Sequence, residues 1–196
     1  MSTGKLFIIS APSGAGKTSL ANALIKELSP RVTLKRVVTY TTRPPRPGEV
    51  DGIDYYFLSV ADFEQRIEEA FFVEFSTVYG HYYGSPKDIL SDMHSGLSYI
   101  MILDKSGALN MKASVSQARL IWVYTSSIQV LSSRLYSRNA DDKDSIEQRL
   151  VIASQELGSL GLQGSFDYNL LNDDFSVALS NLKEIVLSEV LGFDRK

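Results

Sequence analysis

The residues best suited to chemistry directly follow a short apolar run, Leu6-Phe7-Ile8-Ile9, near the start of the chain. A glycine-rich turn between a buried strand and a helix directs several backbone N–H groups to one point, where the helix N-terminus adds partial positive charge. Lys17 would reach the β- and γ-phosphates of a nucleotide there, and the Thr18 hydroxyl would hold Mg²⁺. The predicted phosphate-binding residues are Ala11, Pro12, Ser13, Gly14, Ala15, Gly16, Lys17 and Thr18.

An ordinary flexible strand-to-helix turn is the alternative interpretation of this segment. One position also departs from the P-loop pattern, because Ala11 stands where the first glycine is expected. A methyl group there could restrict the backbone torsions or the approach of the nucleotide. Since Gly14, Gly16, Lys17 and Thr18 all remain, we expect the alanine to be tolerated.

A second group of candidate residues lies in a proline-rich stretch. The segment 31–46 holds five basic residues and no acidic one. Arg43 and Arg46 alternate with three prolines, and arginine forks match phosphate oxygens in bidentate fashion. Tyr55 and Tyr83 could add hydroxyl donors. A solvated basic face is the alternative for such a charge run taken alone.

Short apolar runs alternate with longer segments of helical spacing, which is the pattern of strands buried on both faces and joined by helices. We expect N-caps at Ser59, at Asp174, and at Ser85 with Pro86 as the first helical residue. The sequence therefore predicts an α/β fold around a parallel sheet. The expected strands are 5–10, 34–39, 98–103, 119–124 and 168–171.

Two stretches interrupt this alternation. The prolines and glycines between residues 39 and 52 exclude a central strand or helix, so we expect an inserted mixed lobe over 33–85. The segment 134–149 mixes basic and acidic residues along its length, which is typical of an exposed, mobile flap.

Composition narrows the function classes. The 196 residues carry 20 Lys and Arg against 23 Asp and Glu, so the formal net charge of −3 argues against a surface that follows a nucleic acid polymer. There is no cysteine, and two histidines cannot build a zinc site alone. The apolar runs are too short for a membrane span or a signal peptide. We expect a single-domain cytoplasmic protein that binds small molecules, with no membrane or nucleic acid polymer as partner.

Five segments in register resemble the successive signatures of guanylate kinases, in an order and spacing that hold over nearly the whole chain. They are 11–18, 41–49 (TTRPPRPGE), 54–57 (DYYF), 80–85 (GHYYGS) and 172–174 (NDD). The resemblance implies a P-loop NTPase-type parallel sheet flanked by helices, with an inserted mixed α/β GMP-binding lobe and a helical lid. The implied boundaries are 1–32, 86–133 and 150–196 for the core, 33–85 for the lobe and 134–149 for the lid.

Site residues follow from the resemblance by position. It implies that Arg43, Arg46, Tyr55 and Tyr83 bind the GMP phosphate and that Glu74 and Ser85 read guanine. Guanine presents N1–H and the 2-amino group to one carboxylate and O6 to a hydroxyl, whereas adenine would leave Glu74 facing an acceptor, at a cost of ~1 to 3 kcal/mol. The other implied GMP-binding residues are Thr39, Glu49 and Asp104.

The lid arginines Arg134, Arg138 and Arg149 match positions that in the family approach the phosphates on closure, and with Lys17 they are the implied catalytic residues. Asp104 matches one acidic residue of the family's Asp-x-Asp-x-x-Gly segment, with Ile102 in place of the other.

Asn172 falls on the family's adenine-side loop, but an Asn-Asp-Asp run before a helix is also an ordinary N-cap, and both interpretations stay open.

The resemblance implies reversible, Mg²⁺-dependent transfer of the ATP γ-phosphoryl group to GMP or dGMP, giving ADP and GDP. A non-catalytic guanylate kinase-like module that binds protein partners is one alternative, opposed by the intact Gly16-Lys17-Thr18. A kinase for another nucleoside monophosphate is the other, opposed by Glu74 and Ser85.

Overall fold

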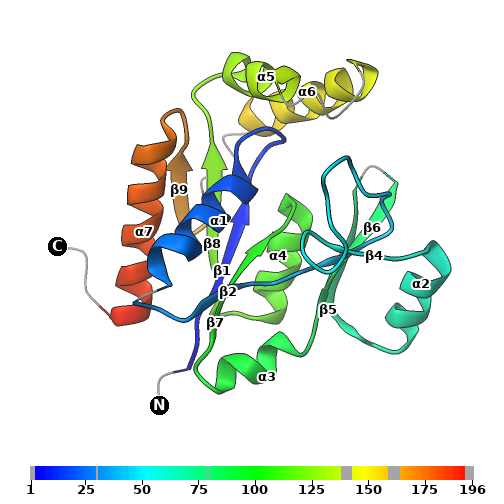
Figure 1. The fold of residues 1–196 in the computed structure, drawn as a ribbon, viewed down its shortest axis with the longest axis vertical. Helices are drawn as coiled ribbons and strands as arrows, with labels where there is room; N and C mark the ends of the chain where they lie inside the picture. The colour runs from blue at the N-terminus through cyan, green and yellow to red at the C-terminus, as the bar shows by residue number, and fades with distance from the viewer. Residues whose placement is uncertain (1–2, 30, 79, 138–142, 159–163, 193–196) are drawn as a thin grey trace.

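A computed structural model describes residues 3–29, 31–78, 80–137, 143–158 and 164–192, which form two sheets with helices around them (Figure 1). The larger sheet has the strand order β2-β7-β1-β8-β9, and all its pairs are parallel. Its strands are β1 (Leu6–Ser10), β2 (Leu34–Arg36), β7 (Ser98–Ile102), β8 (Arg119–Tyr124) and β9 (Tyr168–Leu171). The expected α/β fold around a parallel sheet is confirmed.

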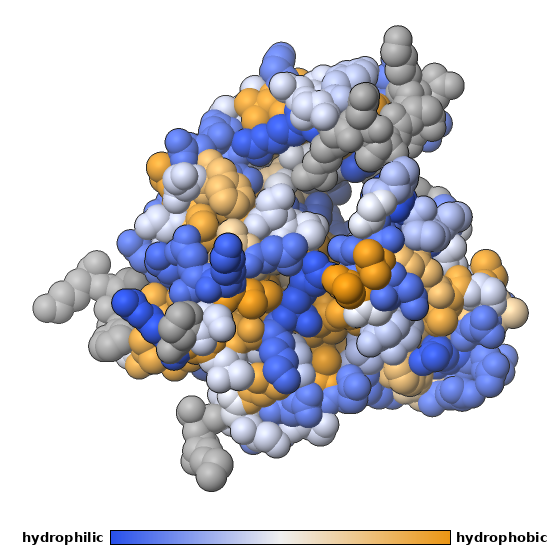
Figure 2. Space-filling view, in the orientation of Figure 1, coloured by the Kyte–Doolittle hydropathy of each residue, from blue (hydrophilic) through white to orange (hydrophobic). Residues whose placement is uncertain are grey.

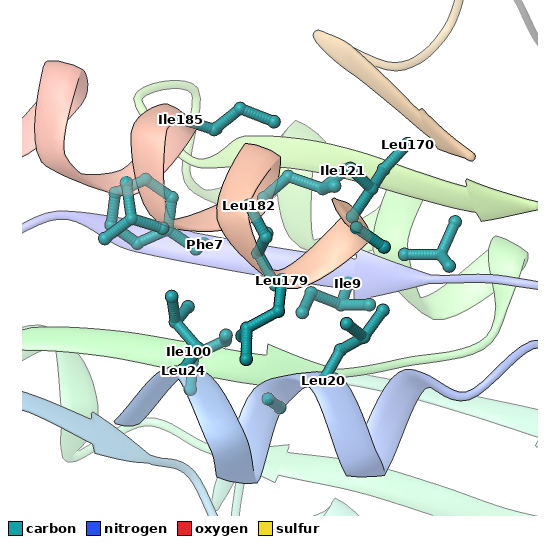
Figure 3. Close-up of a cluster of buried hydrophobic side chains, with 14 of the residues drawn as sticks. Phe7, Ile9, Leu20, Leu24, Ile100, Ile121, Leu170, Leu179, Leu182 and Ile185 are labelled. Carbon is teal, nitrogen blue, oxygen red and sulfur yellow. The ribbon is translucent and has the colours of Figure 1, made fainter. Parts of the chain in front are cut away.

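Helices cover both faces of the parallel sheet because its central strands are apolar on both sides. β1 is fully buried: Phe7 and Ile9 pack with α1 (Lys17–Leu28) and α7 (Phe175–Leu191), as Figure 3 shows. Leu6 and Ile8 face the other way, into a cluster with residues of α3 (Ile89–His94) and α4 (Lys105–Ser114). Residues 11–18, called the P-loop below, follow β1 directly, so this buried strand anchors the proposed phosphate site.

The smaller sheet is mixed, with the order β4-β3-β6-β5. It is formed by β3 (Tyr40–Thr41), β4 (Tyr56–Phe57), β5 (Phe72–Val78) and β6 (His81–Pro86). The helix α2 (Val60–Glu68) packs on it through the buried Phe63, whose ring stacks on Phe72 at 4.5 Å and on Tyr82 at 5.2 Å between centroids. A Cβ on Gly84 would stand 2.8 Å from both phenylalanines, so the aromatic packing requires glycine there.

The two sheets meet at the end of β2. This strand pairs with β7 in the core sheet, although it lies within the range 33–85 expected for the inserted lobe. Arg36, its last residue, donates to the main-chain oxygens of Ile53 and Asp54 in the lobe, and to the Asn22 side chain of α1 at 3.3 Å. One arginine thus connects the core to the loop between β3 and β4.

Two of the three expected helix starts are confirmed. Ser59 accepts a hydrogen bond from the Asp62 backbone at the start of α2, and Asp174 accepts one from Val177 at the start of α7. The N-cap expected at Ser85 is wrong: Ser85 and Pro86 end β6, paired with β5, and α3 begins only at Ile89. The Ser85 hydroxyl donates to Glu74 and is not available to cap a helix.

The charged segment 134–149 is helical where the structure describes it. It includes the end of α5 (Ile128–Ser137) and the start of α6 (Lys143–Gly158), which lie together at one end of the molecule (Figure 1). Arg138 lies outside the described residues. Among the helices that are described, none combines the length and apolar character needed to cross a membrane.

Candidate active site

A cavity of about 570 Å³ lies between the P-loop, the smaller sheet and α6. In the space-filling view a hollow separates the region of α5 and α6 from the lobe formed by the smaller sheet (Figure 2). Thirteen of the predicted site residues line this cavity, so one space joins the triphosphate and acceptor candidates. They are Ala11, Ser13, Gly14, Gly16, Lys17, Thr18, Thr39, Arg43, Arg46, Tyr55, Tyr83, Asp104 and Arg149.

The P-loop is shaped by its glycines and supported by Asn172. Gly14 and Gly16 have φ angles of 87° and 92°, a region that residues with a Cβ rarely adopt. The buried Asn172 amide donates to the main-chain oxygen of Ala15 at 2.7 Å, and a Cβ on Gly16 would stand 2.7 Å from the same amide nitrogen. Asn172 therefore contacts the loop from behind, while Asp174 is the residue that caps α7.

Ala11 fits the position where the P-loop pattern has glycine. Among the residues that the structure describes, Ala70 is the only one other than glycine with a positive φ, so Ala11 needs no glycine-specific torsion. Its side chain is buried in the core cluster against the sheet. Its main-chain oxygen accepts a hydrogen bond from Lys17 Nζ at 2.7 Å, and that of Pro12 accepts another at 3.3 Å. The lysine ammonium thus lies across the mouth of the loop.

Helix α6 brings one cation and one anion to the P-loop. Arg149 Nε donates to the Ser13 hydroxyl at 2.8 Å. Glu156, two helical turns further on, lines the same cavity. Burial raises the pKa of the Glu156 carboxyl, while Lys17 and Lys105 oppose that shift and Asp104 adds to it. The helix therefore places charges of both signs beside the space where phosphates would bind.

The side of the cavity expected to hold the acceptor nucleotide is organised around Arg43. Its guanidinium donates to both carboxylate oxygens of Glu49, at 2.8 and 2.9 Å, and to the main-chain oxygen of Pro44. Glu49 also accepts from the Arg46 backbone at 2.7 Å, so one carboxylate orders the loop that carries both arginines. Burial disfavours the charged guanidinium, but Glu49 and Tyr83 together offset this, and the pKa of Arg43 lies above its ordinary value.

Aromatic rings enclose this arginine. Its guanidinium lies 5.5 Å from the centre of the Tyr55 ring and 5.9 Å from that of Phe57. Tyr55 meets Tyr83 edge to face at 6.0 Å, and burial raises the pKa of its phenol. Tyr55 therefore stays a neutral hydroxyl donor at ordinary pH, beside the arginine.

Two carboxylates lie deeper, each hydrogen-bonded by a serine. Ser85 donates to Glu74 Oε1 at 2.6 Å, and Ser76 donates to Asp104 Oδ2 at 2.8 Å. Glu74 is buried, and its Oε2 has no hydrogen-bond partner. Burial raises the pKa of Glu74 to about 7, with Asp104 adding to the shift and the Ser85 hydroxyl opposing it.

Other predicted residues lie around the cavity without lining it. Pro12 and Ala15 belong to the P-loop, which Asn172 supports, and Glu49 orders the arginine loop. Ser85 donates to the buried Glu74. Arg134 donates to the main-chain oxygen of Asp173 at 3.1 Å. The structure brings Arg149, but not Arg134, to the P-loop.

Several residues at or near the cavity were not predicted from the sequence. Glu156 and Gln148 share α6 with Arg149, and the seven-residue spacing from Arg149 to Glu156 places both on one helix face. Ser76 is two residues after Glu74, so strand alternation could have placed it on the same face. The other missed lining residues are Pro44, Val78, His81, Ile102 and Leu103.

Comparison with known proteins agrees with this geometry. The family model described as Guanylate kinase matches residues 3–189. A guanylate kinase from Coxiella burnetii is 40% identical over 99% of this chain and 92% of its own length, and one from Idiomarina loihiensis is 39% identical over 95% and 87%. The crystal structure of guanylate kinase from Anaplasma phagocytophilum aligns with a TM-score of 0.79 at 25% identity, covering 97% of this chain and 88% of that one. The chain therefore belongs to the guanylate kinase family.

Proposed function

We propose that the protein transfers the γ-phosphoryl group of ATP reversibly to GMP or dGMP, giving ADP and GDP or dGDP. The observation that carries this reaction is the single cavity lined by both the P-loop and the loop of Arg43 and Arg46. Two phosphorylated substrates can meet there only if positive charge faces them from both sides, which Lys17 and Arg149 provide on one side and the two arginines on the other.

The triphosphate is assigned to the P-loop. Its backbone N–H groups and the N-terminus of α1 form an anion site, and the positive φ angles of Gly14 and Gly16 shape it. We assign Lys17 to the β- and γ-phosphates. Its present acceptors include main-chain oxygens, which it can exchange for phosphate oxygens as the nucleotide enters.

The acceptor nucleotide is assigned to the smaller sheet. Arg43, Arg46, Tyr55 and Tyr83 would hold its phosphate, with Glu49 fixing the orientation of the Arg43 fork. Further in, Glu74 Oε2 lacks a partner, which suits the N1–H and 2-amino donors of guanine. Ser85 and Thr39 supply neighbouring hydroxyl groups.

We assign 134–149 as a lid, 33–85 without β2 as the acceptor lobe, and the rest as the core. Arg149 already contacts the P-loop through Ser13 and would face the transferred phosphoryl group. Arg134 and Arg138 are assigned the same role on closure. Phosphoryl transfer needs alignment and positive charge around the equatorial oxygens, without a covalent intermediate, and lid closure would also exclude water.

The residues present fit a magnesium ion carried by the nucleotide. Among the described residues no three His, Asp or Glu side chains are grouped as a metal site, whereas the exposed Thr18 hydroxyl lines the cavity beside the P-loop. Mg²⁺ in kinases is held largely by substrate phosphates and water, with few protein ligands. Thr18 would be its protein ligand, and the ion would neutralise phosphate charge.

The test is ADP release from Mg·ATP with GMP, dGMP, AMP, CMP, UMP or dTMP as acceptor. We expect turnover with GMP and dGMP and none with AMP. Preference for another nucleotide would contradict the acceptor assignment, and GMP binding without turnover would indicate a non-catalytic module. Calorimetry with Mg·ATP checks the P-loop independently: no heat of binding at millimolar ATP would contradict the triphosphate site.

A further inference from the structure

Two carboxylates from different parts of the fold face one small space beside Gly107. A Cβ on Gly107 would stand 3.2 Å from Glu74 Oε2 and 3.3 Å from Asp104 Oδ2. Glu74 belongs to β5, whereas Asp104 precedes α4. The two oxygens therefore lie close to one point, and a side chain at position 107 would crowd both of them.

Asp104 is held at three points. Its Oδ1 accepts hydrogen bonds from the backbones of Ser106, at 2.8 Å, and Gly107, at 3.1 Å, as the N-cap of α4. Its Oδ2 accepts the Ser76 hydroxyl at 2.8 Å. The backbone bonds fix only Oδ1, so Ser76 is the group that fixes the direction of Oδ2. A carboxylate oxygen accepts more than one donor, and Oδ2 can still bind a ligand.

Ser76 lies on the side of β5 that faces the site. Glu74, Ser76 and Val78 alternate with the exposed Phe75 and Thr77, and Val78 lines the cavity. The same strand face thus carries the base-reading carboxylate and the hydroxyl that orients the second one.

We propose that Ser76 is a positioning residue for the acceptor base: it fixes Asp104 Oδ2 beside Glu74, so that the two carboxylates together accept the N1–H and 2-amino donors of guanine. The inference rests on the proposed function. Guanine presents three hydrogens on this edge, while Glu74 has one oxygen occupied by Ser85. A second fixed acceptor gives the 2-amino group a partner of its own.

The experiment compares GMP with IMP, which lacks only the 2-amino group. Calorimetry gives the dissociation constants, and initial rates give kcat and KM. For Ser76→Ala we expect GMP affinity to fall about fivefold or more, the loss typical of one hydrogen bond to a charged group, with little change for IMP, kcat or the KM for ATP. Ser76→Thr keeps the hydroxyl and should restore the preference. Thr77→Ala, at the exposed neighbour, is the matched control.

An unchanged GMP to IMP ratio in Ser76→Ala would overturn the proposal, as would an equal loss for both nucleotides that threonine does not restore. If the alanine variant does not fold, Ser76→Cys, with a weak donor of similar shape, gives the same comparison. The proposed function fails separately, when the wild-type protein shows no turnover with GMP.

Discussion

The two sides of the cavity are built differently. On the proposed ATP side, the groups expected to face the nucleotide are mainly backbone N–H groups, whose directions are set by the torsions of Gly14 and Gly16 and by the Asn172 contact behind them. On the acceptor side the corresponding groups are side chains that already bind one another: Arg43 donates to Glu49, and Ser85 donates to Glu74.

This difference teaches that the two sites respond to different perturbations. The P-loop should be sensitive to backbone geometry and to the one lysine that crosses it. The acceptor site should be sensitive to hydrogen-bond exchange and protonation, because Glu74 is buried and its pKa is raised to about 7.

The largest effect on turnover is expected when the positive charge of Lys17 is removed from the ATP side. Lys17→Ala should lower kcat by about a thousandfold or more, because a cation at the transferred phosphoryl group contributes to transition-state stabilisation on that scale. The melting temperature should change little, since the ammonium is only partly buried and its bonds to the Ala11 and Pro12 carbonyls lie at the mouth of the loop. Lys26→Ala, at the exposed end of the same helix, is the control, and retained turnover in Lys17→Ala would refute the P-loop assignment.

On the acceptor side, Arg43→Lys keeps the positive charge but loses the guanidinium group that donates to both oxygens of a carboxylate or phosphate. Because the bidentate pair with Glu49 orders the loop, we expect the KM for GMP to rise about 10- to 100-fold while the KM for ATP stays nearly constant. Steady-state kinetics with each substrate varied in turn make the measurement. The exposed Arg31→Lys is the matched control. Equal KM increases for both nucleotides would show that the two sides are not independent.

The sequence predicted the parts of the site that are local. Residues 11–18 are contiguous, and the apolar runs around them indicated the parallel sheet, because burial on both faces leaves a clear pattern. β3 and β4 have two residues each, too short for any periodicity, and were not predicted. The helix start expected at Ser85 was wrong because Ser85 lies in β6 and its hydroxyl donates to Glu74, 11 residues away on the paired strand; α3 begins at Ile89.

Long-range contacts were the part that the sequence could not supply. Arg149 meets Ser13, and Asn172 meets Ala15, across more than 130 residues. No local pattern encodes such pairs, so Asn172 remained open between two roles. The contact that the structure shows, from the Asn172 amide to the Ala15 carbonyl, is neither a helix N-cap nor a contact with the adenine base.

A smaller effect tests whether backbone geometry governs the ATP side. Gly16→Ala combines a strained φ with a contact of 2.7 Å to Asn172, whereas Gly192→Ala, at φ 70°, has strain but open space. Both should lose about 1 kcal/mol or more of stability from the torsion. Gly16→Ala should in addition raise the KM for ATP about tenfold, and Gly192→Ala should leave it unchanged. Similar kinetics in the two variants would contradict a geometric role for the Gly16–Asn172 contact.

The smallest effect concerns the charge state of Glu74. Its pKa in the folded protein, about 7, lies above the ordinary value of 4.5, so ionising it disfavours the folded state as pH rises between these values. From pH 6 to pH 8 the free energy of unfolding should fall by about 1 kcal/mol, because a tenfold change in proton binding is worth about 1.4 kcal/mol. Glu74→Gln removes the group, so its melting temperature relative to the wild type should increase over that range, without nucleotide. Glu68→Gln, at an exposed position, is the matched control for the loss of one carboxylate. A parallel pH dependence in wild type and Glu74→Gln would mean that Glu74 does not change its protonation in the folded protein between pH 6 and pH 8, and protonation would then not distinguish the acceptor side from the P-loop.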